Sequence, residues 1–166
     1  MAFLFWLEKQ IVRLEEYLLF TTLVGLTSLQ ITQVLFRYFL NRPLHWVDEL
    51  SRFVFIWMIM IGAGLAMAKA AHFSIDFIRE GMPKLARTLA HIVAQGSIML
   101  FSLVVIIQGL RLMRTGARQI TAALQVPISV AYAAIPFGCA LILYHALMAI
   151  PARLQSEGVI QATADE

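Results

Sequence analysis

Four long uncharged runs, separated by short segments that carry the charges, dominate the pattern of the chain. They occupy residues 17–36, 53–68, 88–110 and 119–152. A membrane-spanning helix needs about 20 mainly apolar residues, and the long stems of Arg52 and Lys69 let the second helix extend beyond its apolar run. The pattern therefore predicts four spans, at about residues 17–36, 46–69, 88–110 and 127–150.

The segment before the first run follows a different pattern. Apolar residues recur at helical spacing from Leu4 to Leu14, whereas the charged residues, Glu15 among them, face elsewhere. This arrangement predicts an interfacial amphipathic helix over about residues 2–15. Because the apolar residues precede the charges, we expect no cleaved signal peptide.

Two prolines frame the last predicted span. We expect Pro127 to start that helix and Pro151 to end it. Residues 111–126 then form a connector, and residues 152–166 form a short polar tail. The rest of the chain, residues 1–151, is expected to be a single membrane domain.

Composition agrees with a chain embedded in lipid. Of its 166 residues 60% are hydrophobic and 14% are charged, and the mean hydropathy is +0.78, which excludes an ordinary water-soluble domain. The net charge of +3 comes from Lys and Arg placed between the apolar runs, which favours contact with phospholipid headgroups over nucleic acid. A single cysteine, Cys139, excludes an internal disulfide. The sequence thus predicts an all-α integral membrane protein.

Charge also bears on orientation. An even number of spans places both termini on one side of the membrane, and Lys and Arg favour the cytoplasmic side. The two sides hold nearly equal numbers of basic residues, with a slight excess on the side of the termini. This excess predicts cytoplasmic termini.

A charged, tryptophan-bearing segment leads into the second span. We define the boundary cluster as Trp46, Asp48, Glu49, Arg52 and Trp57. At about 100° per residue, the two tryptophans fall on one side of the helix and the Asp48/Arg52 pair falls nearly opposite, with a spacing that allows an ion pair. Two interpretations are open and compatible: acids that favour a helix start beside an aromatic belt, or a surface that docks a partner protein or lipid.

Small residues in the second span predict close helix packing. Gly62 and Ala66, like Gly64 and Ala68, have the small-xxx-small spacing that lets helix backbones approach. In the last span, Pro136 removes one backbone hydrogen bond, so we expect a kink that the nearby Gly138 helps to absorb.

Polar residues in the spans point to packing rather than transport. Gln30 and Gln33 share a face of the first span, which is typical of hydrogen bonding between helices. Every acid lies at the end of a predicted span or in a loop, whereas an ion-coupled carrier keeps an acid or a broken helix at mid-membrane. The sequence also has no Ser, His and acid set and no HExxH motif. We therefore expect no enzyme, no metal site, no cofactor and no autonomous carrier.

One alternative from another class depends on histidine. His72, His91 and His145 lie near the same membrane side in the predicted topology, and two imidazoles can hold a haem. The chain would then anchor a redox complex. Each of these residues lies near a helix end or in a loop, where histidine is ordinary, so this interpretation is the weaker one.

Three segments, in their order and spacing, resemble a known family. They read FRYFLNRPLHWVDELSRFVFIW, GAGLAMAKAAHFSIDFI and LQVPISVAYAAIPFG. Over nearly the whole chain the sequence resembles the small membrane subunit of the tripartite ATP-independent periplasmic (TRAP) transporters, the DctQ-type component.

The resemblance implies a role in a bacterial inner-membrane complex. In this family a large subunit of about twelve helices performs sodium-driven transport, and a soluble periplasmic protein delivers an organic acid. In some members the two membrane subunits are fused, and for this chain we expect a separate large subunit. The small subunit is an auxiliary partner that braces the large one. The resemblance also favours cytoplasmic termini, with the boundary cluster on the periplasmic side.

Overall fold

The protein is a bundle of helices in a computed structural model that describes residues 2–42, 44–73 and 84–164. Side chains are described for residues 6–42, 44–69, 89–90 and 92–150. The helices are α1 (Ala2–Phe39), α2 (His45–Phe73), α3 (Lys84–Gly116), α4 (Ser129–Tyr132) and α5 (Ala134–Ala164).

Four stretches of these helices are long and apolar enough to cross a membrane. They are Trp6–Phe39, His45–Lys69, Ile92–Gly116 and Ser129–Ile150, the last of which joins α4 to α5. The predicted all-α fold with four membrane spans is confirmed.

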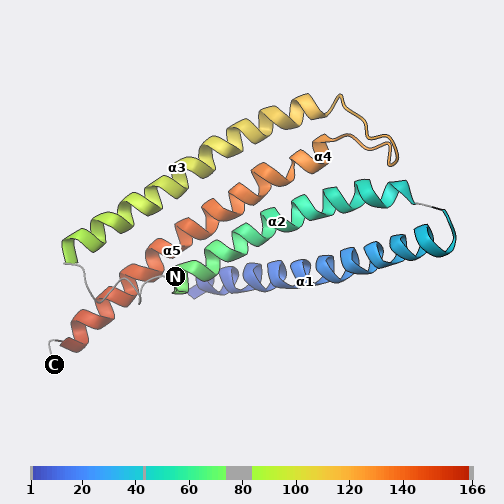
Figure 1. Cartoon of the computed structure of the whole chain (residues 1–166). Helices are drawn as coiled ribbons and strands as arrows, with labels where there is room; N and C mark the ends of the chain where they lie inside the picture. Colours follow the sequence, from blue (N-terminus) through green and yellow to red (C-terminus); the bar gives the residue numbers. More distant parts are fainter. Residues whose placement is uncertain (1, 43, 74–83, 165–166) are drawn as a thin grey trace.

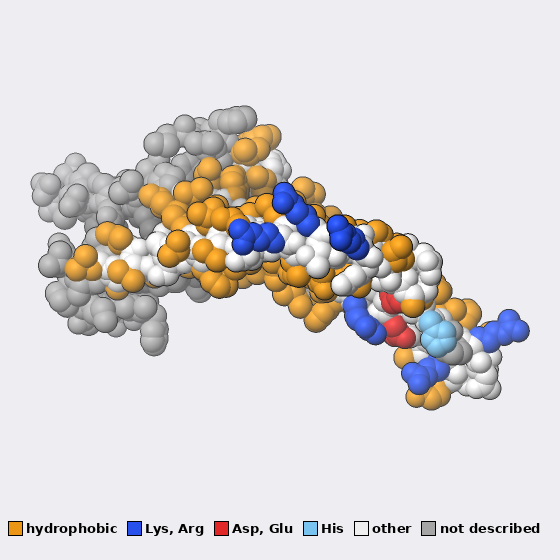
Figure 2. All heavy atoms as spheres, turned by 90° about the horizontal axis from the view of Figure 1, so that it is seen from above, with side chains coloured by type: hydrophobic (Ala, Val, Ile, Leu, Met, Phe, Trp, Pro, Cys, Tyr) orange, Lys and Arg blue, Asp and Glu red, His pale blue; other side chains and the backbone are white. Residues whose placement is uncertain are grey.

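The long helices stand in a row in the order α1, α2, α5, α3 (Figure 1). The helix α5 packs against α2 on one side and α3 on the other, while α1 packs mainly against α2. Seen from above α3, hydrophobic side chains cover much of the surface, and Lys and Arg form a few separate groups (Figure 2). Both outer helices, α1 and α3, carry many exposed large hydrophobic side chains.

Glycines set the distance between the central helices. A Cβ atom on Gly138 in α5 would lie 2.6 Å from the Cβ of Met60 and 2.9 Å from its carbonyl oxygen, and one on Gly64 would lie 2.9 Å from the Cβ of Leu141. Real Cβ atoms do not approach so closely, so α2 and α5 touch through backbone at these points. This is the contact that small residues permit between helices in lipid, where packing replaces the hydrophobic effect.

The first helix differs from the expected arrangement. The predicted interfacial segment over residues 2–15 and the first span belong to one continuous helix, α1, because no residue between them interrupts the helical hydrogen bonding. The placement of its first half at the membrane surface stays a prediction. A short turn at Asn41, whose φ of 50° is tolerated by asparagine, then reverses the chain into α2.

Two predicted helix ends are wrong. The third helix continues beyond residue 110 to Gly116, where the ring of Tyr132 would lie 2.6 Å from an added Cβ. The last helix continues through Pro151 to Ala164. A proline removes one backbone hydrogen bond but does not have to end a helix, and the following segment is rich in helix-forming residues.

The last span is interrupted near its start. Ala133 separates the short helix α4 from α5. Pro136 lies three residues later. Because proline lacks an amide hydrogen, the carbonyl of Tyr132 loses its helical partner. The Pro136 ring lies against Gly109 of α3, where an added Cβ would be 2.9 Å from the proline Cδ.

Candidate functional site

The first turns of α2 form the centre of a polar contact network. Asp48 lies in the first turn, where a carboxylate is favoured by the exposed amides and the dipole of the helix. The side-chain amide of Gln33 in α1 donates a hydrogen bond of 2.7 Å to Asp48 Oδ1. This bond ties the last turns of α1 to the start of α2.

Glu49 fastens the loop between α3 and α4 onto α2. Its carboxylate accepts hydrogen bonds from the backbone amides of Ala123, at 3.0 and 3.1 Å, and Leu124, at 2.8 Å. The loop presents these amides because it folds back on itself, with an isolated antiparallel bridge between Ile120 and Pro127. A carboxylate that accepts hydrogen bonds from several backbone amides forms strong, charge-assisted contacts. Glu49 therefore anchors the loop.

The Glu49-bound loop is closed by its own side chains. The hydroxyl of Thr121 accepts a hydrogen bond from the Val126 amide at 3.2 Å. Gln125 adopts a positive φ of 55° at the turn, and its side-chain amide donates to the Ala122 carbonyl at 3.0 Å. The loop is thus an ordered structure that α2 positions.

Trp57 joins α2 to the last span. Its indole Nε1 donates a hydrogen bond of 3.0 Å to the carbonyl of Val130 in α4, and its ring lies 5.5 Å from that of Phe137, at an angle of 50°. A tilted aromatic pair at this distance stabilises packing beyond its buried area.

The other members of the boundary cluster point outward. Trp46 is 41% exposed, and the Arg52 side chain is exposed as well. Among the described residues, no ion pair joins Arg52 to Asp48 or Glu49, so the ion pair that the sequence spacing allows is not formed. Both acids instead bind neighbouring segments of the chain.

The residues expected to pack helices together differ in burial. Gln33, Gly64, Pro136 and Gly138 are buried between helices. At Gly62 there is more room, since an added Cβ would lie 3.9 Å from the nearest side-chain atom of Leu19 in α1. In contrast, the side chains of Gln30 and Ala66 are exposed. Ala66 lines a shallow apolar groove between α2 and α3, together with Ala63, Met67, Ser97, Ile98, Phe101, Ser102 and Ile142.

The polar face of α3 is bonded to α5. The side-chain amide of Gln95 donates to the carbonyl of Ala146, and Ser102 is 1% exposed. A carbonyl in a helix can accept a second hydrogen bond besides its helical one. This face therefore serves contact between helices.

A second polar cluster lies toward the other end of the bundle, and the sequence patterns did not reveal it. The Nε2 atom of His145 lies 3.1 Å from Glu15 Oε1, and the two side chains are 0% and 5% exposed. Glu15 was expected off the apolar face of an interfacial helix, with the other charges of that segment, but its side chain is buried against α5. The sequence did offer one indication of this contact. His145 is an ionisable residue inside the last apolar run, and such a residue in a membrane span needs a partner.

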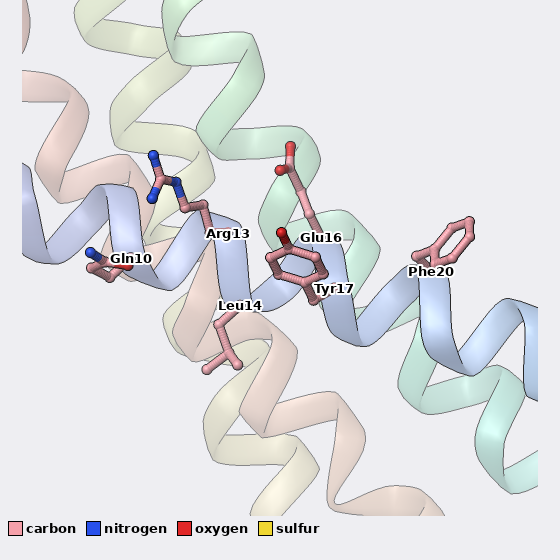
Figure 3. A pocket seen from close by; sticks show the side chains of 6 residues that line it. All are labelled: Gln10, Arg13, Leu14, Glu16, Tyr17 and Phe20. Carbon is pink, nitrogen blue, oxygen red and sulfur yellow. The ribbon is translucent and has the colours of Figure 1, made fainter.

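An exposed ion pair lies beside this buried one. Lys69 Nζ of α2 lies 2.8 Å from Glu16 Oε1 of α1, with exposed fractions of 61% and 46% for the two side chains. On the outer side of α1, Glu16 also lines a shallow depression with Gln10, Arg13, Leu14, Tyr17 and Phe20 (Figure 3). Adjacent acids of α1 thus point in different directions, one inward and one outward.

The chemistry of these clusters is that of structural contacts. In the part of the chain that the structure describes, no group of three or more His, Cys, Asp or Glu side chains could hold a metal ion. Of the three histidines considered for haem binding, His145 already directs Nε2 to Glu15. The side chains of His72 and His91 lie outside the described residues.

Comparison with known proteins identifies a family of transporter components. The family described as tripartite ATP-independent periplasmic transporters, DctQ component, matches residues 26–155. The chain is 31% identical over 81 residues to the sialic acid TRAP transporter small permease protein SiaQ of Vibrio cholerae, covering 49% of this chain and 47% of that protein.

Two other relatives give similar results. The C4-dicarboxylate TRAP transporter small permease protein DctQ of Vibrio cholerae is 29% identical over 94 residues, covering 57% of this chain and 40% of that protein. The sialic acid TRAP transporter permease protein SiaT of Haemophilus influenzae is 33% identical over 87 residues, covering 52% of this chain and 14% of that protein. The aligned part is thus less than half of each of these three relatives.

The haem-anchor interpretation has no support among these relatives, which are named as transporter permeases and not as enzymes. Since the family match extends from the first span to the last helix, the chain belongs to the DctQ component family of the tripartite ATP-independent periplasmic transporters.

Proposed function

We propose that this chain is the small auxiliary subunit that braces a separate large permease subunit. The complex would take up an organic acid, driven by a sodium gradient and supplied by a periplasmic binding protein. The observation that best supports a bracing role is the row of helices α1, α2, α5 and α3 (Figure 1). As far as the described residues go, the row has broad sides for contact and surrounds no central path for a solute, which supports a role beside a transporting subunit.

The outer helices supply contact surface for such a partner. On α1, Phe20 is 69% exposed and Ile31 is 57% exposed, and on α3, Val93 and Phe101 are 66% and 68% exposed. Within a membrane these side chains must meet either lipid tails or another apolar helix. We propose that one of the two outer helices packs against the large subunit.

The boundary cluster divides between two roles in this proposal. Asp48, Glu49 and Trp57 hold neighbouring parts of this chain in place. Trp46 and Arg52 remain exposed and are the members available to a partner protein or to phospholipid. We propose that the exposed members dock the partner and that the hydrogen-bonded members support them.

The family and the four apolar helices indicate a multi-pass protein of the bacterial inner membrane. We propose that both termini are cytoplasmic, which places the boundary cluster and the loop that Glu49 binds on the periplasmic side. Fusion of a reporter that is active only in the cytoplasm to the C-terminus tests this orientation. A periplasmic C-terminus would contradict it.

Reconstitution tests the auxiliary role. Proteoliposomes with this chain alone are expected to show no sodium-dependent uptake when the binding protein and its organic acid are supplied. Proteoliposomes that also contain the large subunit are expected to show uptake. Sodium-dependent uptake by this chain alone would overturn the proposal.

Co-purification with the large subunit tests the docking surface. The double variant Trp46→Ala/Arg52→Ala is expected to recover several-fold less large subunit than the wild type. Arg118→Ala, which removes an exposed arginine of the loop between α3 and α4 and not of an outer helix, is the matched control and should leave recovery unchanged. Equal recovery by the double variant and the wild type would show that the exposed members do not dock the partner.

A further inference from the structure

The Glu15/His145 pair is the part of the molecule whose chemistry the bracing role does not use. The carboxylate comes from α1 and the imidazole from α5, helices that are otherwise separated by α2 in the row. Figure 3 shows α1 crossing over α5 close to Leu14, the residue before Glu15. The pair therefore marks the point where the first and last long helices meet.

The surroundings of the pair satisfy only part of its hydrogen-bonding capacity. Three buried polar atoms at this point have no hydrogen-bond partner among the described residues. They are Glu15 Oε2, His145 Nδ1 and the hydroxyl oxygen of Tyr144. Backbone amides cannot help, because those of a continuous helix already bond within the helix. An ionisable pair in this position is an expensive arrangement unless its net charge is small.

The charged groups around the pair do not neutralise the carboxylate. From α1, Glu8 and Glu15 are both close enough to Tyr144 of α5 to interact with it electrostatically. From α2, Lys69 is bonded to the exposed Glu16. From α3, the nearby contact is the neutral amide of Gln95 on the Ala146 carbonyl, and the side chain of His91 lies outside the described residues. Among the described side chains, the imidazole of His145 is the group bonded to Glu15 that can carry a positive charge.

We propose that Glu15 and His145 form a buried proton-binding site, in which one proton shared by carboxylate and imidazole holds the first half of α1 against α5. With the proton bound, the pair has no net charge, either as carboxylate and imidazolium or as carboxylic acid and imidazole. After the proton leaves to water, one negative charge remains between apolar helices. The contact between α1 and α5 is therefore strongest while the pair holds one proton, and it weakens as pH rises through release of that proton.

This inference goes beyond the bracing role and does not depend on it. The site would make the anchoring of α1 responsive to pH, whichever subunit the chain supports. The boundary cluster has no such site, because Glu49 is held by backbone amides that do not titrate.

Two measurements on the full chain in lipid nanodiscs test the site. Nitrogen NMR of labelled histidine follows the protonation of His145, assigned by comparison with His145→Asn. The thermal unfolding midpoint is measured on the same samples between about pH 5 and about pH 10, a range that includes ordinary histidine titration. In the wild type we expect a protonation change at His145 and a fall of the midpoint by several degrees as pH rises.

Variants at adjacent acids supply the comparison. Glu15→Gln, which keeps the shape of the side chain, is expected to remove most of the pH-dependent fall, because no buried negative charge can then form. Glu16→Gln, which changes the exposed neighbour, should retain the wild-type pH response. The proposal is overturned if the wild type shows no protonation change at His145, or if Glu15→Gln responds to pH as the wild type does. If Glu15→Gln does not fold, the NMR titration of the wild type decides alone.

Discussion

Two carboxylates, Glu49 and Glu15, show how differently the two ends of this helix row handle a negative charge. Glu49 accepts three hydrogen bonds from the amides of a loop and is partly exposed. Glu15 is buried between helices and meets one imidazole. A loop has free amides to offer, whereas a helix has used its own, so a carboxylate between helices depends on another side chain.

The consequence is a difference in what each contact can do. The loop amides do not titrate, so they bind the ionised carboxylate of Glu49 without changing their own charge. This makes a fixed anchor. The partner of Glu15 is itself ionisable, so its contact can change with conditions. The Glu49 end of the molecule is therefore suited to hold a loop in place. The Glu15/His145 end is suited to respond to a change in pH.

Removal of the imidazole is expected to have the largest effect. His145→Ala leaves the Glu15 carboxylate buried without its partner and should lower the free energy of unfolding by about 3–5 kcal/mol. Lys69→Ala, which breaks the exposed pair with Glu16, should lower it by at most about 1 kcal/mol. Reversible unfolding in mixed micelles measures both. Equal losses would mean that burial does not distinguish the two pairs.

A smaller loss of stability is expected at Gly138, where the backbone of α5 touches α2. Gly138→Ala forces a Cβ against Met60 and should reduce the free energy of unfolding by about 1–3 kcal/mol. Gly25→Ala in α1 is the control, since an added Cβ there has no atom within 4 Å; it should be neutral or slightly stabilising. A neutral Gly138→Ala variant would show that the helices can separate without loss.

The Trp57 contact should respond in two steps. Trp57→Phe keeps an aromatic ring beside Phe137 but loses the hydrogen bond to the Val130 carbonyl, for an expected loss of about 1 kcal/mol. Trp57→Ala also loses the ring contact and should be clearly more destabilising. Thermal unfolding of the two variants separates these contributions. If both variants lost the same stability, the ring contact would contribute nothing.

The most local effect is expected at Glu49. Glu49→Gln weakens the charge-assisted bonds to the loop, so amide hydrogen exchange at Ala123 and Leu124 should become several-fold faster. Exchange in the central turns of α2 should not change. Asp48→Asn serves as the control, because its side-chain oxygen can still accept from Gln33. Unchanged exchange at the loop would show that it is ordered by its own bridge alone.

The pattern of the chain was sufficient for the gross architecture. Long uncharged runs must lie in lipid as helices, because only a helix or a closed barrel satisfies its backbone there. Helix ends were less accurately predicted, since Pro151 and the residues after 110 are compatible with both a continuing and an ending helix. Small differences in local free energy decide between these outcomes.

The site residues could be predicted only as candidates. Helical angles grouped the boundary cluster into faces but could not show that Glu49 binds the loop around Ala123, far along the chain. The same limit applied to Glu15, because helical spacing alone could not show that it lies inward against His145 while the next residue, Glu16, lies outward. Pairing across long sequence separations depends on which helices become neighbours.

By itself the sequence determined that this is a four-span membrane protein whose motifs place it in the DctQ component family, because hydropathy and local spacing are properties of each segment alone. Only the tertiary structure decided the order of the helices in the row and the partners of Glu15, Asp48 and Glu49. In lipid, apolar surfaces do not select their neighbours by hydrophobicity. Shape and a few polar contacts make that selection, and they become visible only when the helices are assembled.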